Sequence, residues 1–477
     1  MKKSTGVIGV VVVLGAAYLG ATWYVGKEAR KTIEEAVAQA NTRLARYLGP
    51  DADGVKIGIA DYQRRFFSSD VVYTVSLKDP DGKPVDLALH DHLQHGPFPL
   101  GALQEGHLAP LLAYSRARLA ATPATQAWID SQKGGSPLTV DTRVGFGGSG
   151  HSVWTFSPTE LIEDGDTLNF SGGTVDIDFS KNFNSGSAAG QFDAFSLANA
   201  QTGESLHIKN IRLDSKTDVA DGNKMHVQSS ATVDSLTMDK AGDEAVAIEK
   251  LTVKLDNVQA GDMLDGSLHY DFGRVAVGPV DLGSLSLGVR ANRLDLAALA
   301  ALAKEYDAIQ ARHGGQGDQD LVLSDEEEQA LREKLMAVLA SDPSVAVEQL
   351  LWKNDDGQSK ASLQVDFTRP ADAGQGDADV LLAQALKQVR LDFSLAKPMF
   401  IRVFGQAQAD PQQRLQMEMM GAMIYDQYMA RLRDAGLVQV DGDTTAASVL
   451  YENDSVTVNG QAMSAAEFMQ RVLSVAM

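Results

Sequence analysis

The chain has 477 residues, no cysteine and a formal net charge of −21. Without cysteine, disulfides and thiolate metal sites are excluded, and this acidic balance argues against the clustered lysine and arginine that nucleic-acid binding requires. Beyond the N-terminal segment, about 450 residues are too many for one ordinary core, so two or three domains are expected.

Residues 4–26 form an uncharged stretch between Lys3 and Lys27. As a helix they would extend roughly 34 Å, enough to cross a hydrocarbon core of about 30 Å. A cleaved signal peptide is the alternative, but the long stretch and its bulky end favour an uncleaved transmembrane anchor. The side chains assigned to this anchor are Val7, Val11, Leu14, Leu19, Trp23 and Tyr24.

The orientation of this anchor is only weakly marked by charge. Two lysines precede the span and Lys27, Arg30 and Lys31 follow it, so the positive-inside count nearly balances. Because long domains translocate largely regardless of charge, we expect a single-pass bacterial inner-membrane protein with its large C-terminal part in the periplasm. Ala16 and Gly20 are small residues at a spacing that permits a homodimer of the span.

Residues 27–49 are predicted to continue the anchor as a stalk helix. The apolar residues of this segment share a spacing of three or four, and they are Ile33, Val37, Ala40 and Leu44. The helix is expected to end near Gly49 and Pro50, which both disfavour helix.

From about Val55 the apolar pattern changes to a period of two, which predicts β-strands. Residues 50–137 are expected to form an α/β region that contains a strand over 70–77. Residues 138–292 are expected to form a long-stranded antiparallel region, because turn formers separate its strands. The predicted strands of that region are 174–179, 191–198, 205–214, 224–238, 245–255, 266–272 and 284–291.

These strands are predicted to have one apolar and one polar face, as Leu251, Val253 and Leu255 illustrate. An apolar sheet face needs a cover. The candidates are the chain's own helices, a second sheet, a partner protein or lipid acyl chains.

The C-terminal region, residues 293–477, is predicted to be rich in helices and to end in strands. Helices are expected over 294–312, from a capping box at Ser324 and Glu327 to residue 340, over 379–388, and after Pro411. The last helix carries a candidate apolar ligand or interaction face, with ordinary core as the alternative: Met419, Met420, Met423, Ile424 and Met429. The fold class is therefore α+β, mainly β.

Two local motifs were tested for chemistry. His90, His92 and His95 lie within six residues, but a strand would turn Asp91 away from His90 and His92, and the spacing matches no standard zinc pattern. Gly145, Gly147 and Gly150 spell a dinucleotide fingerprint, yet an alternating strand follows where that motif needs a helix. We therefore assign no catalytic, cofactor-binding or metal residue and expect a protein that is not an enzyme.

Several short segments resemble the YdgA-like family of bacterial envelope proteins. They are residues 1–27, 36–41, 62–69, 95–100 and 456–460. Arg65 departs from the family pattern, where glycine is expected. The resemblance implies an inner-membrane-anchored envelope protein with no established catalytic residues and a loose link to motility. The layout is also similar to that of AsmA-like envelope proteins, whose long sheets form apolar grooves for lipid, although a shared architecture does not transfer function.

Two functions follow as expectations. The first is an envelope scaffold, anchored in the inner membrane, that binds lipid or another apolar ligand in a β-sheet groove. The alternative is a structural or protein-interaction module that forms a homo-oligomer. Neither function requires a cofactor or nucleic acid.

Overall fold

The structure is a computed structural model, and its described residues cluster into two compact units. It describes residues 34, 37, 38, 40–42, 54–65, 67–78, 82–96, 98–132, 134–163, 165–181, 185–220, 224–313, 323–370, 384–408 and 410–476. The first unit covers the chain to residue 221 and the second covers it from residue 242. Residues 222–241, which include all of β12 (Lys224–Asp239), are divided between the two units. The five predicted regions remain a prediction.

The described chain is mainly β, and its strands pair in antiparallel fashion with a few helices, as predicted. The predicted anchor over residues 4–26, including Val7, Val11, Leu14, Leu19, Trp23 and Tyr24, lies outside the described residues. Among the residues that are described, no helix combines the length and apolar character needed to span a membrane.

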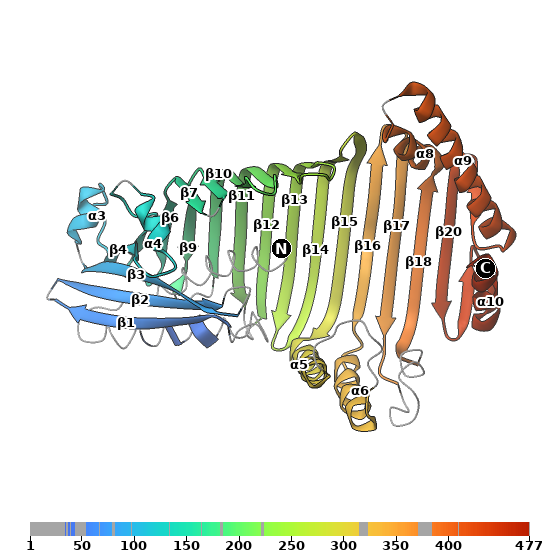
Figure 1. Cartoon of the computed structure of the whole chain (residues 1–477). Helices are drawn as coiled ribbons and strands as arrows, with labels where there is room; N and C mark the ends of the chain where they lie inside the picture. Colours follow the sequence, from blue (N-terminus) through green and yellow to red (C-terminus); the bar gives the residue numbers. More distant parts are fainter. Residues whose placement is uncertain are drawn as a thin grey trace. The chain divides into compact units, whose positions relative to one another are not determined.

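The first unit is built on one antiparallel sheet. Its strands are β1 (Lys56–Arg64), β2 (Ser68–Lys78), β3 (Pro84–His95), β4 (Ala113–Ala120), β5 (Leu138–Val144), β6 (Gly150–Phe156), β7 (Thr159–Glu163), β8 (Asp166–Phe170), β9 (Gly173–Phe179), β10 (Ser185–Asn199) and β11 (Ser205–Ala220). Consecutive strands pair from β1 to β6, and β6 then pairs with β9. The long strand β10 pairs with β9 and β8 on one side and with β11 on the other. Within this unit β1–β3 cross the direction of β9–β11 (Figure 1). Two short helices, α3 (Leu100–Gln104) and α4 (Gln126–Asp130), lie in its connections.

The first unit has a sealed core on one face of its sheet. In β9 the side chains of Val175 and Ile177 point into the core while those of Asp176 and Asp178 point away, as the period of two predicts. The helical residues described between 34 and 42 cover this core, because Val37 and Ala40 are buried in it. The predicted helical stripe is therefore confirmed at Val37 and Ala40.

The second unit is also built on one antiparallel sheet. Its strands are β13 (Val246–Ala260), β14 (Met263–Val277), β15 (Val280–Asp295), β16 (Ser344–Asn354), β17 (Gly357–Phe367), β18 (Leu386–Ala396), β19 (Gln439–Asp441), β20 (Thr444–Glu452), β21 (Ser455–Val458) and β22 (Gln461–Ser464). Consecutive strands pair from β13 to β18, after which β18 pairs with β20 and β20 with β19 and β21. The prediction of a helix over 379–388 holds for the described residues 384 and 385 but is wrong from Leu386, where β18 begins.

The helices of the second unit lie at the ends of its long strands and along its C-terminal edge, where α9 and α10 are drawn beside β20 (Figure 1). They are α5 (Leu296–Arg312), α6 (Asp325–Leu339), α8 (Lys397–Gln406), α9 (Pro411–Asp434) and α10 (Ala465–Ala476). Because α5 follows β15 and α6 precedes the neighbouring β16, both lie at one end, whereas α8 follows β18 at the other. The capping box between Ser324 and Glu327 is confirmed at the start of α6.

Candidate functional site

The candidate site is the apolar face of the sheet in the second unit. Residues that pair across antiparallel strands point to the same side of a sheet, so the strand register shows which side chains share a face. One apolar row runs from β13 to β21 through Leu255, Leu268, Val289, Val347, Leu363, Leu391, Val449 and Val458. A second row runs from β13 to β20 through Val253, Tyr270, Leu287, Leu350, Ala361, Phe393 and Ala447.

The reverse face of the same sheet is polar. Between the two apolar rows, a row pointing the other way includes Lys254, His269, Gly288 and Gln349. The adjacent polar row begins with Asp256, Ser267 and Arg290. The predicted one-sided character of the long strands is therefore confirmed in this unit, and the apolar face is continuous across it.

A β-bulge keeps this face continuous across β16. The register shifts between Val347 and Leu350, so that an odd-numbered and an even-numbered residue point to the same side. Glu348, at the bulge, points its carboxylate to the Arg290 guanidinium on the neighbouring strand. A strict period of two would have placed Leu350 and Trp352 on the polar face.

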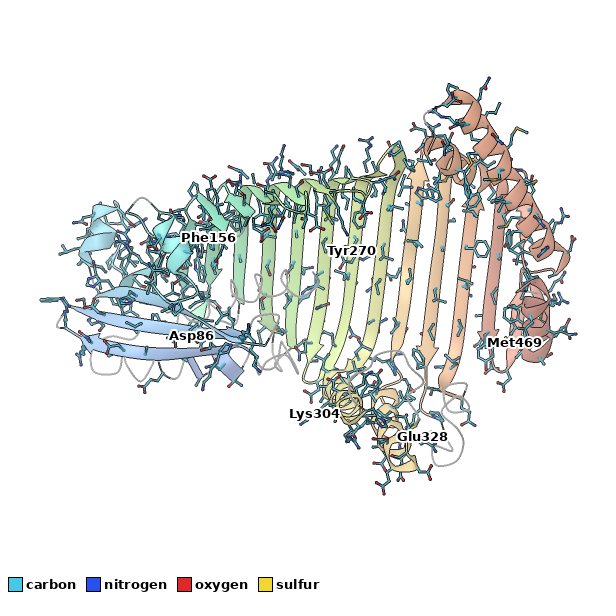
Figure 2. The ribbon with its side chains drawn as sticks, viewed as in Figure 1. Asp86, Phe156, Tyr270, Lys304, Glu328 and Met469 are labelled. Carbon is cyan, nitrogen blue, oxygen red and sulfur yellow. The ribbon has the colours of Figure 1, made fainter. Side chains whose placement is uncertain are left out.

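The middle of the apolar face is open in the described part of the chain. Leu363, near the middle of β17, exposes 38% of its surface, and Leu350 and Val345 are also exposed. Tyr270 lies in the middle of β14 with no helix drawn over it (Figure 2). Because apolar surface is normally buried against another layer, this open face is the candidate binding surface of the unit.

The helices cover the ends of this face and its β20–β22 edge, where Val449 and Val458 pack with Phe468 of α10. At one end, Met399 of α8 is fully buried and its Sδ accepts a hydrogen bond from Ser359 Oγ at 3.4 Å. Tyr425 of α9 donates a hydrogen bond from its hydroxyl to Thr445 Oγ1 at 2.8 Å. At the other end, Met336 and Leu339 of α6 pack with Ala385 and Phe367. These contacts leave the central rows uncovered.

The methionine face of α9 points away from the residues that attach this helix to its unit. Met419 and Met423 expose 66% and 64% of their surfaces, and Met420 is exposed as well. Ile424 and Met429 are half-buried. The alternative that this stripe is ordinary core is therefore wrong for Met419, Met420 and Met423. The helix is attached instead through the buried Gly421 and Tyr425.

The histidines near residue 90 do not converge. His90 and His92 lie on the exposed face of β3, where His92 Nδ1 is 2.7 Å from Asp70 Oδ1. Asp91 is buried on the opposite face, as the period of two predicts, and His95 Nε2 lies 3.1 Å from the buried Ser69 Oγ. No group of three side chains arranged to hold a metal ion occurs within the described ranges.

The glycine motif has a structural role. Gly150 begins β6, the strand predicted after the motif, and a Cβ there would lie 2.1 Å from the Phe179 ring. This position therefore requires glycine for close packing, and no helix follows it to bind a pyrophosphate.

Much of the candidate site lies on β16, β17 and β18, three strands that the sequence patterns do not predict. The signal was present in β17, where Ala361, Leu363 and Val365 alternate with polar residues. In β16, the bulge interrupts the alternation of apolar and polar residues.

Comparisons with known proteins agree with the resemblance seen in the sequence. The chain is 25% identical over 495 residues to Protein YdgA of Escherichia coli (strain K12), which covers 98% of this chain and 96% of that protein. It is also 25% identical over 502 residues to the uncharacterized protein YihF of the same organism, covering 98% of both chains. No solved structure matches it. A family model described as "Bacterial protein of unknown function (DUF945)" matches residues 1–466, so the chain belongs to this family.

Proposed function

We propose that the protein binds the acyl chains of lipids on the open apolar face of its second unit. The supporting observation is the pair of apolar rows that cross the sheet and lie open along its middle strands in the described chain. Burying one leucine side chain contributes about 1.5–3 kcal/mol, so covering a few of these residues would support a stable complex. Because the reverse face of this sheet is polar, acyl chains would bind on one side of the sheet only.

In this proposal residues 4–26 hold the chain in the bacterial inner membrane and its large C-terminal part lies in the periplasm. The uncharged length of the stretch supports the anchor. Alkaline phosphatase fused to the C-terminus, which is active only outside the cytoplasm, tests the orientation. An inactive but full-length fusion would contradict it.

The lipid proposal is tested by placing a charge on the apolar face. Leu363→Asp is suitable because Leu363 is partly exposed and the substitution leaves no sealed cavity. Gln364→Asp is the matched control, since Gln364 is the next residue on β17 and points to the polar face. Both variants and the parent chain are extracted gently from cells, and the co-purified lipids are quantified by mass spectrometry.

We expect the parent chain and Gln364→Asp to carry the same enriched lipids, and Leu363→Asp to lose most of them. Equal lipid content in all three proteins, or no enrichment in the parent chain, would refute acyl-chain binding on this face. A thermal unfolding scan of each variant checks that Leu363→Asp is still folded.

The exposed methionines of α9 favour a second function, a protein-interaction module that forms a homo-oligomer. Methionine side chains adapt to varied partner surfaces, and a stripe whose Met419 and Met423 are largely exposed is available to a second copy. Light scattering of the parent chain and of Met419→Gln/Met423→Gln tests this function. It predicts an oligomer for the parent chain and a smaller species for the double variant. A monomeric parent chain would exclude it.

A further inference from the structure

The first unit has an open cleft of about 760 Å³ on the face of its sheet that points away from the core. One row of paired residues crosses its floor: Arg143 on β5, His151 on β6, Asp178 on β9, Ser187 on β10 and Lys216 on β11. The segment 106–111, which includes His107, Leu108 and Leu111, forms one side of the cleft.

The local structure around Tyr114 holds this segment in place. Tyr114 pairs with Arg143 across β4 and β5, and Gly101 of α3 packs directly on its ring. The Tyr114 hydroxyl donates to Glu105 Oε1 at 2.7 Å, and the Arg116 guanidinium also contacts Glu105. Because this network fixes α3 and Glu105, it also fixes the segment that follows them.

The same segment places His107 against Arg143. Arg143 Nη1 lies 2.9 Å from Nδ1 of His107 and also contacts its Nε2. A guanidinium can only donate, so at most one of the two ring nitrogens accepts from it. Only Nη1 of Arg143 takes part in these contacts, so the guanidinium has further N–H donors for an anionic group in the cleft.

The other charges of the cleft are already paired. His151 Nδ1 lies 2.9 Å from Asp178 Oδ1, and Lys216 Nζ lies 3.1 Å from Asp218 Oδ2. Asp178 is two strands from Arg143, a separation of roughly 10 Å at the usual strand spacing. Within the described ranges Arg143 has no carboxylate partner, although the chain as a whole is strongly acidic.

We propose that this cleft binds the anionic oxygen group, a phosphate or a carboxylate, of an amphiphilic molecule. The planar guanidinium of Arg143 matches the two oxygens of such a group. Leu108, with 75% of its surface exposed at the cleft, and Leu111 contact the apolar part of the molecule. The cleft lies in the first unit, so this inference does not depend on acyl-chain binding by the second.

The test uses the full chain in nanodiscs of zwitterionic lipid, with empty nanodiscs as the blank. Isothermal titration calorimetry measures the binding of hexyl phosphate, hexanoate, inorganic phosphate and hexyltrimethylammonium. These ligands are short enough to stay in solution, and inorganic phosphate reports the polar contacts alone. The variants are Arg143→Gln, Arg143→Lys, Leu108→Ser and the control Arg118→Gln, an exposed arginine on β4 outside the cleft.

We expect hexyl phosphate or hexanoate to bind the parent chain and Arg118→Gln with equal affinity. Loss of a charge-assisted hydrogen bond weakens binding roughly tenfold to a hundredfold, so Arg143→Gln should fall in that range. Arg143→Lys, which keeps the charge but loses the planar fork, should be intermediate and checks that loss of binding is not loss of folding. Leu108→Ser should weaken hexyl phosphate without changing inorganic phosphate.

Three results would overturn the proposal. The first is unchanged affinity in Arg143→Gln, and the second is equally tight binding of hexyltrimethylammonium. The third is inorganic phosphate binding as tightly as hexyl phosphate with no effect of Leu108→Ser, which would identify a site for free phosphate instead of an amphiphile. Failure of the Leu363→Asp experiment on the second unit would leave all of these readouts unchanged.

Discussion

Replacing Asp91 with asparagine should stabilise the first unit at neutral and alkaline pH. Asp91 lies on β3 between Val71 and Ala117 of the neighbouring strands, and only 3% of its surface is exposed. Ser115 Oγ donates a hydrogen bond to its Oδ1 at 2.6 Å. Burial is the largest effect, and it raises the pKa of Asp91 from 3.8 to about 6 despite that hydrogen bond.

The size and pH dependence of the effect follow from this pKa. Below pH 3.8 the carboxyl group is neutral in both the folded and the unfolded chain, and its burial carries no charge penalty. As pH rises through 6 the buried group must ionise, and the first unit loses about 3 kcal/mol of stability relative to a neutral side chain. Asp91→Asn removes this loss, so its advantage should be about 3 kcal/mol at pH 8 and roughly half of that at pH 5.

Urea unfolding at several pH values measures this difference. Trp154 is buried in the core of the first unit, so a background with the other three tryptophans replaced by phenylalanine reports on that unit. Asp86→Asn is the control, because Asp86 is exposed on the same strand. The reasoning is refuted if Asp91→Asn is no more stable than the parent chain at pH 8, or if its advantage is the same at pH 5.

The other predictions concern packing and helix ends. In Gly101→Ala the new Cβ would lie 2.6 Å from the buried Tyr114 ring, and thermal unfolding should show a loss of about 1–3 kcal/mol. Met399→Ala should cost about 2–5 kcal/mol in urea unfolding, because Met399 is fully buried between α8 and β17. In Glu327, hydrogen bonds from the Ser324 backbone and from His313 lower the pKa to about 2 from 4.5. Glu327→Gln should therefore be less stable than the parent chain above pH 4.5. Thermal unfolding measured at a series of pH values should show this stability difference shrinking as pH falls toward 2.

The two packing changes have controls within the chain. Gly135→Ala adds a methyl group where no atom lies within 4 Å, and it should leave stability unchanged. Met419→Ala removes an exposed methionine and should change stability by less than about 0.5 kcal/mol. If Gly135→Ala loses as much stability as Gly101→Ala, the contact with the Tyr114 ring is not the cause. If Met419→Ala loses as much as Met399→Ala, burial of the side chain is not the cause. If the stability difference between Glu327→Gln and the parent chain stays constant down to pH 2, the ionised carboxylate is not its cause.

The two units show how the same strand pattern produces different surfaces. In the first unit the alternating residues of β5 and β9 are buried, and Val37 and Ala40 help to seal them. In the second unit equally apolar alternation in β17 leaves Leu363 exposed. A period of two shows which side chains share a face, but it carries no information on whether another element covers that face.

The predicted fold was most accurate where signals are local. The capping box at Ser324, the helix after Pro411 and the opposite directions of His90 and Asp91 were all confirmed, because each depends on residues within a few positions. The strands that carry Leu350 and Leu363 were missed. In β16 the bulge at Glu348 breaks the alternation, and only pairing with β15 and β17 restores a common face.

The sequence by itself determined that this chain is mainly β, that its long strands have one apolar side, and that no recognisable catalytic or metal motif is present. These properties follow from composition and short-range periodicity. Tertiary structure alone decided that the methionines of α9 are exposed, that Arg143 faces His107 in a cleft, and that the apolar face of the second unit is open. Each of these depends on which distant segments pack together, and that choice is made by long-range contacts that no local pattern encodes.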